Sequence, residues 1–135
     1  MKAKKENGFN EHIYAEKALL SAIITLGEIE NIKSEIATDD FYDVKNREVY
    51  KTILRLNKEK LIVDFMNLRI ALGEDYDELL LELISLNTLD YRLYQKKVKE
   101  NSVSRKKEYL INEYKHSETH CVNHQNIQIT YRYKS

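Results

Sequence analysis

Apolar residues recur at helical spacing along most of this chain, and the first strongly periodic segment runs from about Asn10 to Leu26. Asparagine is a residue type that caps helix N-termini, and Gly27 stands where a helix C-terminus is expected. Apolar side chains that are three, four and seven positions apart lie on one face of a helix. The segment therefore predicts an amphipathic helix whose apolar face is formed by Ile13, Leu19, Leu20, Ile23 and Ile24.

Four shorter helices are predicted between residues 29 and 86. The first two are marked by apolar stripes at Ile29, Ile32 and Ile36 and at Val49, Ile53 and Leu56. Asp64 and Gly73 bracket the third as an N-cap and a C-cap residue. The most apolar stretch of the chain, 79–86, predicts a buried fourth helix that is opened by acidic residues in its first turn.

From about Thr88 to Tyr114 neither Gly nor Pro interrupts the chain, which predicts one long helix. After Lys115 the helical period is lost, and apolar and polar residues alternate between Ile127 and Tyr133 as they would in a strand. The predicted fold is all-α: a compact bundle of about five short helices, then one long projecting helix and an irregular C-terminal tail. The predicted boundaries are a flexible N-terminus at 1–9, a helical domain at 10–115 and a disordered or strand-like tail at 116–135.

Two faces of the long helix are candidates for binding. At 100° per residue one sector is amphipathic and aromatic, and a second sector on the opposite side is basic. Because tyrosine, arginine and apolar residues are frequent at protein interfaces, the first sector predicts a partner-binding face made of Tyr91, Tyr94, Val98, Arg105 and Tyr109. The second sector holds the candidate phosphate contacts Arg92, Lys96, Lys99 and Lys106.

The basic sector stands out because the whole chain of 135 residues has 22 basic and 22 acidic residues and a formal net charge of zero. Residues 92–107 contain seven basic residues and one acidic residue. Such a stripe is able to track phosphates, so a small nucleic-acid-binding protein is the alternative function. A solvated helix face and a surface that matches an acidic protein partner explain the same pattern, and all three interpretations stay open.

Catalytic chemistry has no basis in this sequence. It has three glycines and no proline, so glycine-rich phosphate loops are absent, and the printed chain contains no G-x-x-x-x-G-K-[ST] motif. We therefore expect a non-enzyme without a cofactor. A single cysteine and the lack of a long apolar segment predict a cytoplasmic protein that does not bind membranes. A weak candidate metal cluster lies in the tail, where incidental histidines are the alternative: His116, His120, Cys121 and His124.

Four stretches in order resemble the N-terminal domain of DnaB-type replicative DNA helicases. The stretch from Tyr14 to Ile23 is similar to the opening helix of that domain, and Asp40-Phe41-Tyr42-Asp43 is similar to its D-F-Y turn. The stretch from Ile62 to Leu68 matches its next short helix, and Tyr94, Val98, Glu100, Ser102 and Arg105 follow the order of its projecting helix. The resemblance spans residues 12 to 112. It departs from the family pattern at Ser21, where glycine is usual, and at Asn46, where histidine is common.

The resemblance implies a scaffold role rather than catalysis. In that family this domain forms a collar on a hexameric ring and contacts primase and helicase loaders, whereas ATP hydrolysis belongs to a separate RecA-like domain. The expected partners are therefore primase, a helicase loader, other helicase subunits or a second copy of the chain, with weak or absent DNA binding. Residues 116–135 stand where the family has the second helix of a hairpin, which favours a monomer or dimer over a closed collar.

Several origins of such a chain stay open. The sequence is compatible with an excised domain, with a truncated or frameshifted gene and with a stand-alone relic on a mobile element. A mimic of the primase C-terminal domain, which resembles the same helical fold, is less favoured because the D-F-Y turn is typical of the helicase side.

Overall fold

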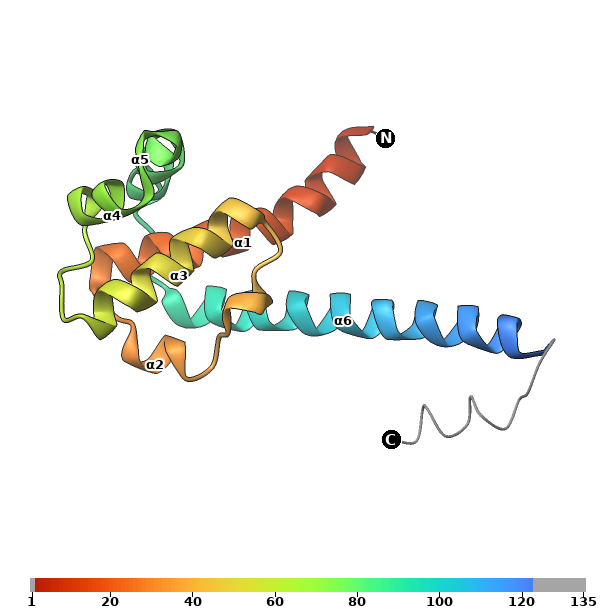
Figure 1. Ribbon diagram of the computed structural model, residues 1–135. Helices are drawn as coiled ribbons and strands as arrows, with labels where there is room; N and C mark the ends of the chain where they lie inside the picture. Colours follow the sequence, from red (N-terminus) through yellow and green to blue (C-terminus); the bar gives the residue numbers. More distant parts are fainter. Residues whose placement is uncertain (1, 123–135) are drawn as a thin grey trace. The chain divides into compact units, whose positions relative to one another are not determined.

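The computed structural model describes the backbone of residues 2–122 and the side chains of residues 11–115. Helices form the regular structure of this part of the chain, which has no strand (Figure 1). The α-helices are α1 (Lys2–Leu26), α2 (Glu30–Lys33), α3 (Val44–Lys58), α4 (Phe65–Leu72), α5 (Asp77–Leu86) and α6 (Tyr91–Val122). Two 3-10 turns, η1 (Thr38–Asp40) and η2 (Glu74–Tyr76), lie between them. The predicted all-α fold with a long last helix is confirmed.

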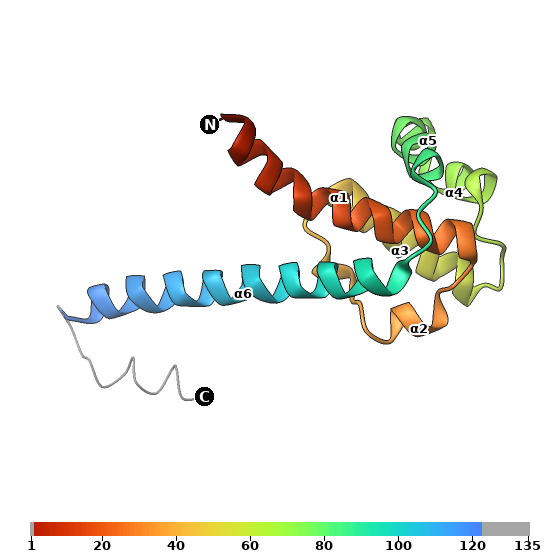
Figure 2. The ribbon, with the colours of Figure 1, turned by 180° about the vertical axis from the view of Figure 1, so that it is seen from behind.

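The chain divides into two compact units, the first ending at Ser102 and the second beginning at Val103. In the first unit α1 and α3 run side by side, and α4 and α5 are neighbours, as Figures 1 and 2 both show. The first turns of α6 also belong to this unit. The second unit contains the rest of α6.

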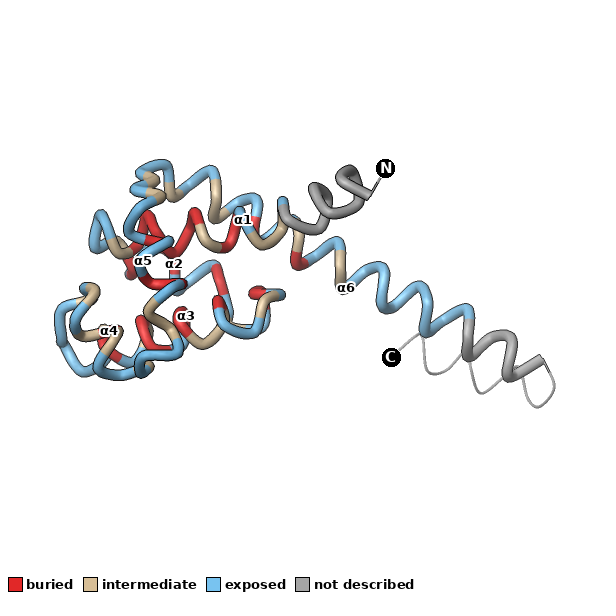
Figure 3. The backbone as a smooth tube through the Cα atoms, turned by 90° about the horizontal axis from the view of Figure 1, so that it is seen from above, coloured by how far each residue is buried: buried red, intermediate tan, exposed pale blue. Residues whose placement is uncertain are grey.

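The hydrophobic core lies in the first unit, on the faces of the helices that are red in Figure 3. Phe41 stacks on Tyr50 at its centre, with ring centroids 4.7 Å apart. Burying each large apolar side chain contributes about 1.5–3 kcal/mol, so the core is the main source of stability. The apolar stripes predicted from the sequence supply most of its members: Leu19, Leu20, Ile23, Ile32, Ile36, Val49, Ile53, Leu56, Leu68, Leu80 and Leu83.

Short polar side chains and left-handed residues set the helix ends. The carboxylates of Asp43 and Asp64 accept hydrogen bonds from the backbone N–H groups three residues later, at 3.0 and 2.9 Å, and so cap α3 and α4. Gly73 ends α4 with a φ of +92°, a value that glycine adopts without strain. The predicted caps Asp64 and Gly73 are thus confirmed.

The longest helices run further than the apolar period predicts. Helix α1 begins at Lys2, within the segment that is predicted to be flexible, and α6 continues past Lys115 to Val122. Neither extension contains a proline, and the Lys, Ala and Glu residues of the first extension favour helix without needing an apolar face. Helix α2, in contrast, stops at Lys33, before Ile36. The predicted strand-like pattern at 127–133 lies outside the described residues.

Candidate interaction surface

A buried polar cluster anchors the first turns of α6. Asp40, at the end of η1, is 1% exposed. Its carboxylate accepts hydrogen bonds from the Ser102 hydroxyl (2.7 Å), the Lys99 ammonium (3.2 Å) and the Ala37 backbone N–H (2.8 Å). A charged acceptor strengthens each of these bonds, and together they hold the turns of α6 up to Ser102 within the first unit.

A second buried carboxylate, Glu16 on α1, organises the turn that precedes α3. It accepts hydrogen bonds from the backbone N–H groups of Tyr42 (2.5 Å) and Asp43 (3.2 Å) and from the Asn46 side-chain amide (3.1 Å). These donors lie at the N-terminus of α3, where a negative charge is stabilised. The Oδ1 atom of Asn46 has no hydrogen-bond partner within the described residues. Glu16 and the D-F-Y turn therefore form one structural unit.

The aromatic sector of α6 faces inward over its first turns. Tyr91 and Tyr94 pack against the core, and Val98 is only 1% exposed. Ser102 completes this sector as the partner of Asp40. Val98 thus does not lie on an accessible contact face, which corrects its place in the predicted partner-binding set. The sector was predicted as one face, but periodicity does not distinguish a face that packs on its own core from one that awaits a partner.

Beyond Val103, in the second unit, α6 carries exposed large apolar side chains. Val103, Leu110 and Tyr114 follow one another at spacings of seven and four residues and are 41%, 60% and 42% exposed. Such spacing places them on one stripe of a helix, the pattern of a helix-pairing seam. We name Val103, Leu110 and Tyr114 the α6 stripe. Sequence reasoning missed it because a basic residue, Lys107, interrupts the apolar period.

Two residues of the predicted partner-binding set flank the α6 stripe in the second unit. Tyr109 is 63% exposed and Arg105 is half-buried. Both therefore stay candidates for contact with a partner.

Part of the predicted basic sector is engaged in ion pairs. Lys99 is bonded to Asp40, and the Lys96 ammonium lies 4.0 Å from the Glu100 carboxylate. Lys96, Lys99 and Arg92 border a small cavity of about 310 Å³ that is also lined by the carboxylates of Glu35 and Glu100. Two acidic groups at the same cavity oppose the binding of a phosphate there. Lys106, in the second unit, lies one turn before Leu110.

The predicted metal cluster lies outside the described side chains. This holds for His116, His120, Cys121 and His124 alike. Among the side chains of residues 11–115, no group of three or more His, Cys, Asp or Glu residues is placed to hold a metal ion. Within residues 2–122, no helix combines the length and the apolar composition that crossing a bilayer requires.

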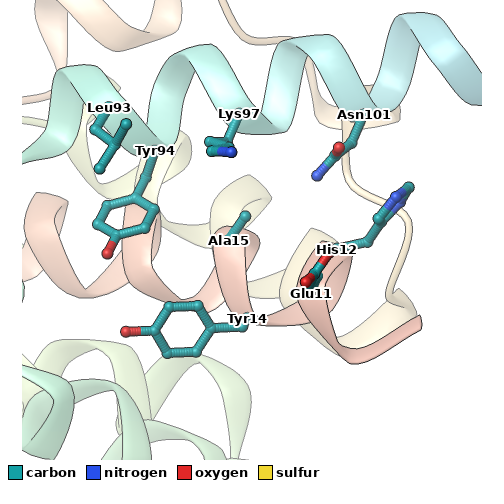
Figure 4. A pocket seen from close by; sticks show the side chains of 8 residues that line it. All are labelled: Glu11, His12, Tyr14, Ala15, Leu93, Tyr94, Lys97 and Asn101. Atoms are coloured by element: carbon teal, nitrogen blue, oxygen red, sulfur yellow. The ribbon is translucent and has the colours of Figure 1, made fainter. Parts of the chain in front are cut away.

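A groove with a volume of about 660 Å³ lies between α1 and the first turns of α6 (Figure 4). The rings of Tyr14 and Tyr94 meet edge to face in it, with centroids 6.1 Å apart. The hydrogen bond with Tyr14, together with partial burial, raises the pKa of Tyr94. Of the groove residues, only Tyr94 is among the partner-binding residues predicted from the sequence, because α1 and α6 are distant in the chain. The lining is Glu11, His12, Tyr14, Ala15, Leu93, Tyr94, Lys97 and Asn101.

These features define a class: an all-α helical domain in which two buried carboxylates hold the elements together and a long last helix exposes an apolar stripe. The comparison with protein families refines this class. Residues 9–111 match the DnaB-like helicase N terminal domain, so the chain belongs to that family. The match concerns the N-terminal domain of the helicase and not its ATPase domain. Comparisons with curated proteins and with solved structures gave no significant match.

Proposed function

We propose that this chain is a non-catalytic interaction module of the DNA replication machinery, which docks onto a replication protein by helix pairing through the α6 stripe. Family membership supports the setting, since the matched domain is the N-terminal domain of a replicative helicase. The observation that carries the docking mode is the run of exposed Val103, Leu110 and Tyr114 on one side of a long helix. Leaving such a stripe in water is unfavourable, and a facing helix buries it.

The expected occupant is a helix of primase, of a helicase loader, of another helicase subunit or of a second copy of the chain. Arg105 and Tyr109 flank the stripe and add the arginine and tyrosine contacts that are frequent at the energetic centre of an interface. Lys107 lies between Val103 and Leu110 along the stripe. A basic residue within a pairing seam favours a facing helix with an acidic residue at that level.

Light scattering behind a sizing column tests this proposal. The chain is measured alone and mixed with the primase C-terminal domain from the same source. We expect a mixed peak, or a dimer of the chain alone, that is lost in Leu110→Asp because a carboxylate in an apolar seam is costly to desolvate. Val44→Asp is the matched control, since Val44 on α3 is 65% exposed and lies outside the stripe.

Two outcomes contradict the proposal. The first is a monomer that forms no complex with primase, with a loader or with helicase subunits. The second is a complex that survives Leu110→Asp as well as it survives Val44→Asp.

A further inference from the structure

The groove between α1 and the first turns of α6 has no part in the proposed pairing through the α6 stripe. It lies within the first unit, and its volume of about 660 Å³ is in the range typical of binding sites, roughly 300–1,000 Å³. Figure 4 shows the side chains that line it, which come from both helices. The groove is therefore a second, separate surface on which a ligand or partner is able to bind.

One end of the groove is apolar and aromatic, whereas Glu11, His12 and Asn101 line the other end. Ala15 is buried at the floor, and Leu93, which is 43% exposed, borders the groove from α6. Tyr14 and Tyr94 present ring edges and hydroxyl groups beside it. Tyrosine rings pair an apolar body with a polar tip, a combination suited to an aromatic or leucine anchor of a partner.

The groove is elongated along the helix axes. Leu93, Lys97 and Asn101 follow one another at spacings of four residues along α6, and Glu11 and Ala15 do so along α1. At 1.5 Å per residue the α6 wall extends over about 12 Å, the length of two to three helical turns. An elongated groove between two helices fits a third, short helix better than it fits a compact small molecule.

The charge of Lys97 indicates which kind of partner helix fits the groove. Lys97 is exposed at the groove, and among the described side chains no carboxylate forms an ion pair with it, whereas the neighbouring Lys96 and Lys99 are paired with Glu100 and Asp40. The helix also carries the basic excess of residues 92–107. Glu11 lies on the opposite wall, so the charge preference concerns the α6 side of the groove.

We propose that the groove between α1 and α6 binds a short amphipathic helix of a partner protein, whose leucine or aromatic anchor packs on Tyr14, Tyr94 and Leu93 and whose carboxylate pairs with Lys97. This inference names a second docking site beyond the α6 stripe and rests on the proposed role as an interaction module. It does not depend on which replication protein pairs with the stripe.

The probe is a pair of synthetic helical peptides with the same leucine and phenylalanine face, flanked by glutamates in one and by lysines in the other. Each is titrated into the ¹⁵N-labelled full chain. This chain carries Leu110→Asp, which prevents pairing through the α6 stripe. We expect the glutamate peptide to shift amide signals of residues 11–15 and 93–101 and to bind roughly tenfold more tightly than the lysine peptide at low salt. Lys97→Glu reverses this order, whereas the control Lys58→Glu, on the exposed side of α3, leaves it unchanged.

A second variant pair separates the apolar contact from folding. Leu93→Asp abolishes binding of the glutamate peptide, whereas Leu89→Asp, an exposed leucine that does not line the groove, retains it. Binding that is absent, that is equal for both peptides or that shifts signals elsewhere overturns the groove proposal. None of these results affects the light-scattering test of the α6 stripe, so the two proposals fail separately.

Discussion

Single buried polar side chains connect distant parts of this domain. Glu16 of α1 and Asp40 of η1 are each 1% exposed, and besides the local bond from Ala37 their hydrogen bonds reach residues 26 to 62 positions away. Burying a carboxylate whose hydrogen bonds are satisfied in this way costs little free energy. Leaving a buried donor without its acceptor costs considerably more. Glu16 in the opening helix and Asp40 in the D-F-Y turn are thus explained by the hydrogen bonds that they accept inside the domain.

The substitution Glu16→Gln tests this interpretation of the opening helix. Its amide nitrogen would replace one of the two carboxylate oxygens and face either the Tyr42 N–H or the Asp43 N–H, so at least one donor loses its acceptor. We expect the free energy of unfolding to fall by about 3 kcal/mol in urea titrations. The control Glu82→Gln, which removes an exposed ion pair with Lys17, costs at most about 1 kcal/mol. Equal losses in the two variants would contradict the role of Glu16.

Tyr50 gives the domain a characteristic response to alkaline pH. Burial, and to a lesser extent the negative charge of Asp40, raises the pKa of its hydroxyl above the ordinary value near 10, and the hydroxyl donates a hydrogen bond of 2.7 Å to the Ile36 carbonyl. The unfolded chain therefore releases this proton at a lower pH than the folded chain does. Consequently the contribution of Tyr50 to stability is complete below about pH 10 and is lost as the pH rises above it.

Unfolding measured from pH 8 to pH 11 detects this loss. We expect the free energy of unfolding to decline more steeply above pH 10 in the native chain than in Tyr50→Phe, which cannot ionise there. The variant is also less stable by about 1 kcal/mol at neutral pH, because it lacks the bond to Ile36. If the free energies of unfolding of the native chain and of Tyr50→Phe decline in parallel above pH 10, Tyr50 does not cause the loss of stability.

At the scale of elements, hydrogen bonds hold the first turns of α6 in place. Asp90 caps the helix through the Leu93 N–H at 3.2 Å, and Ser102 and Lys99 then fasten it to Asp40. Only Val98 contributes a fully buried apolar side chain from this stretch. The first turns of α6 are therefore held by these hydrogen bonds as well as by the packing of Val98, Tyr91 and Tyr94 on the core.

The substitution Ser102→Ala measures this dependence. It removes the 2.7 Å bond to Asp40 and creates no large cavity, so we expect a loss of about 1–2 kcal/mol in chemical denaturation. Ser104→Ala is the matched control, because Ser104 is an exposed serine on the same helix and its removal is expected to be nearly neutral. A neutral Ser102→Ala would mean that Asp40 does not anchor α6.

The helices could be predicted from the sequence, whereas the side-chain hydrogen bonds that join distant helices could not. Apolar stripes such as Val49, Ile53 and Leu56 and the cap pair Asp64 and Gly73 are local signals, and the structure has the corresponding helices. The bond between Asp40 and Ser102 joins residues 62 positions apart, and a serine leaves no trace in hydrophobic periodicity. For the same reason the sequence could not predict that the aromatic sector of α6 packs against the core over its first turns.

The candidate surfaces were predicted less well than the fold. Tyr109 and Arg105 stay candidates for partner contact, which the sequence offers because interface residue types are recognisable in it. The α6 stripe and the groove were missed, the first because Lys107 interrupts it and the second because α1 and α6 form it jointly. Exposure, which decides between a core face and a contact face, is a property of the folded chain.

At the scale of the whole molecule, the charge distribution predicts little affinity for nucleic acids. The formal net charge is zero, and Lys96 and Lys99 already have acidic partners. In fluorescence titrations with single- and double-stranded DNA we expect weak binding and a salt dependence that corresponds to fewer than about three phosphates. The double variant Lys96→Glu with Lys106→Glu should bind no less tightly. Steep salt dependence that these reversals remove would favour the nucleic-acid-binding alternative.

The central claim is that the chain docks through α6 beyond Val103, and hydrogen exchange of its amides tests that claim most directly. The full chain is compared alone and in the presence of excess primase C-terminal domain, and peptides that cover residues 103–115 are followed together with peptides from α3. We predict that exchange slows in 103–115 and stays unchanged in α3, because a pairing helix shields the α6 stripe and stabilises its backbone bonds. Unchanged exchange in 103–115 with primase, with a loader and at raised concentrations of the chain itself would contradict the account.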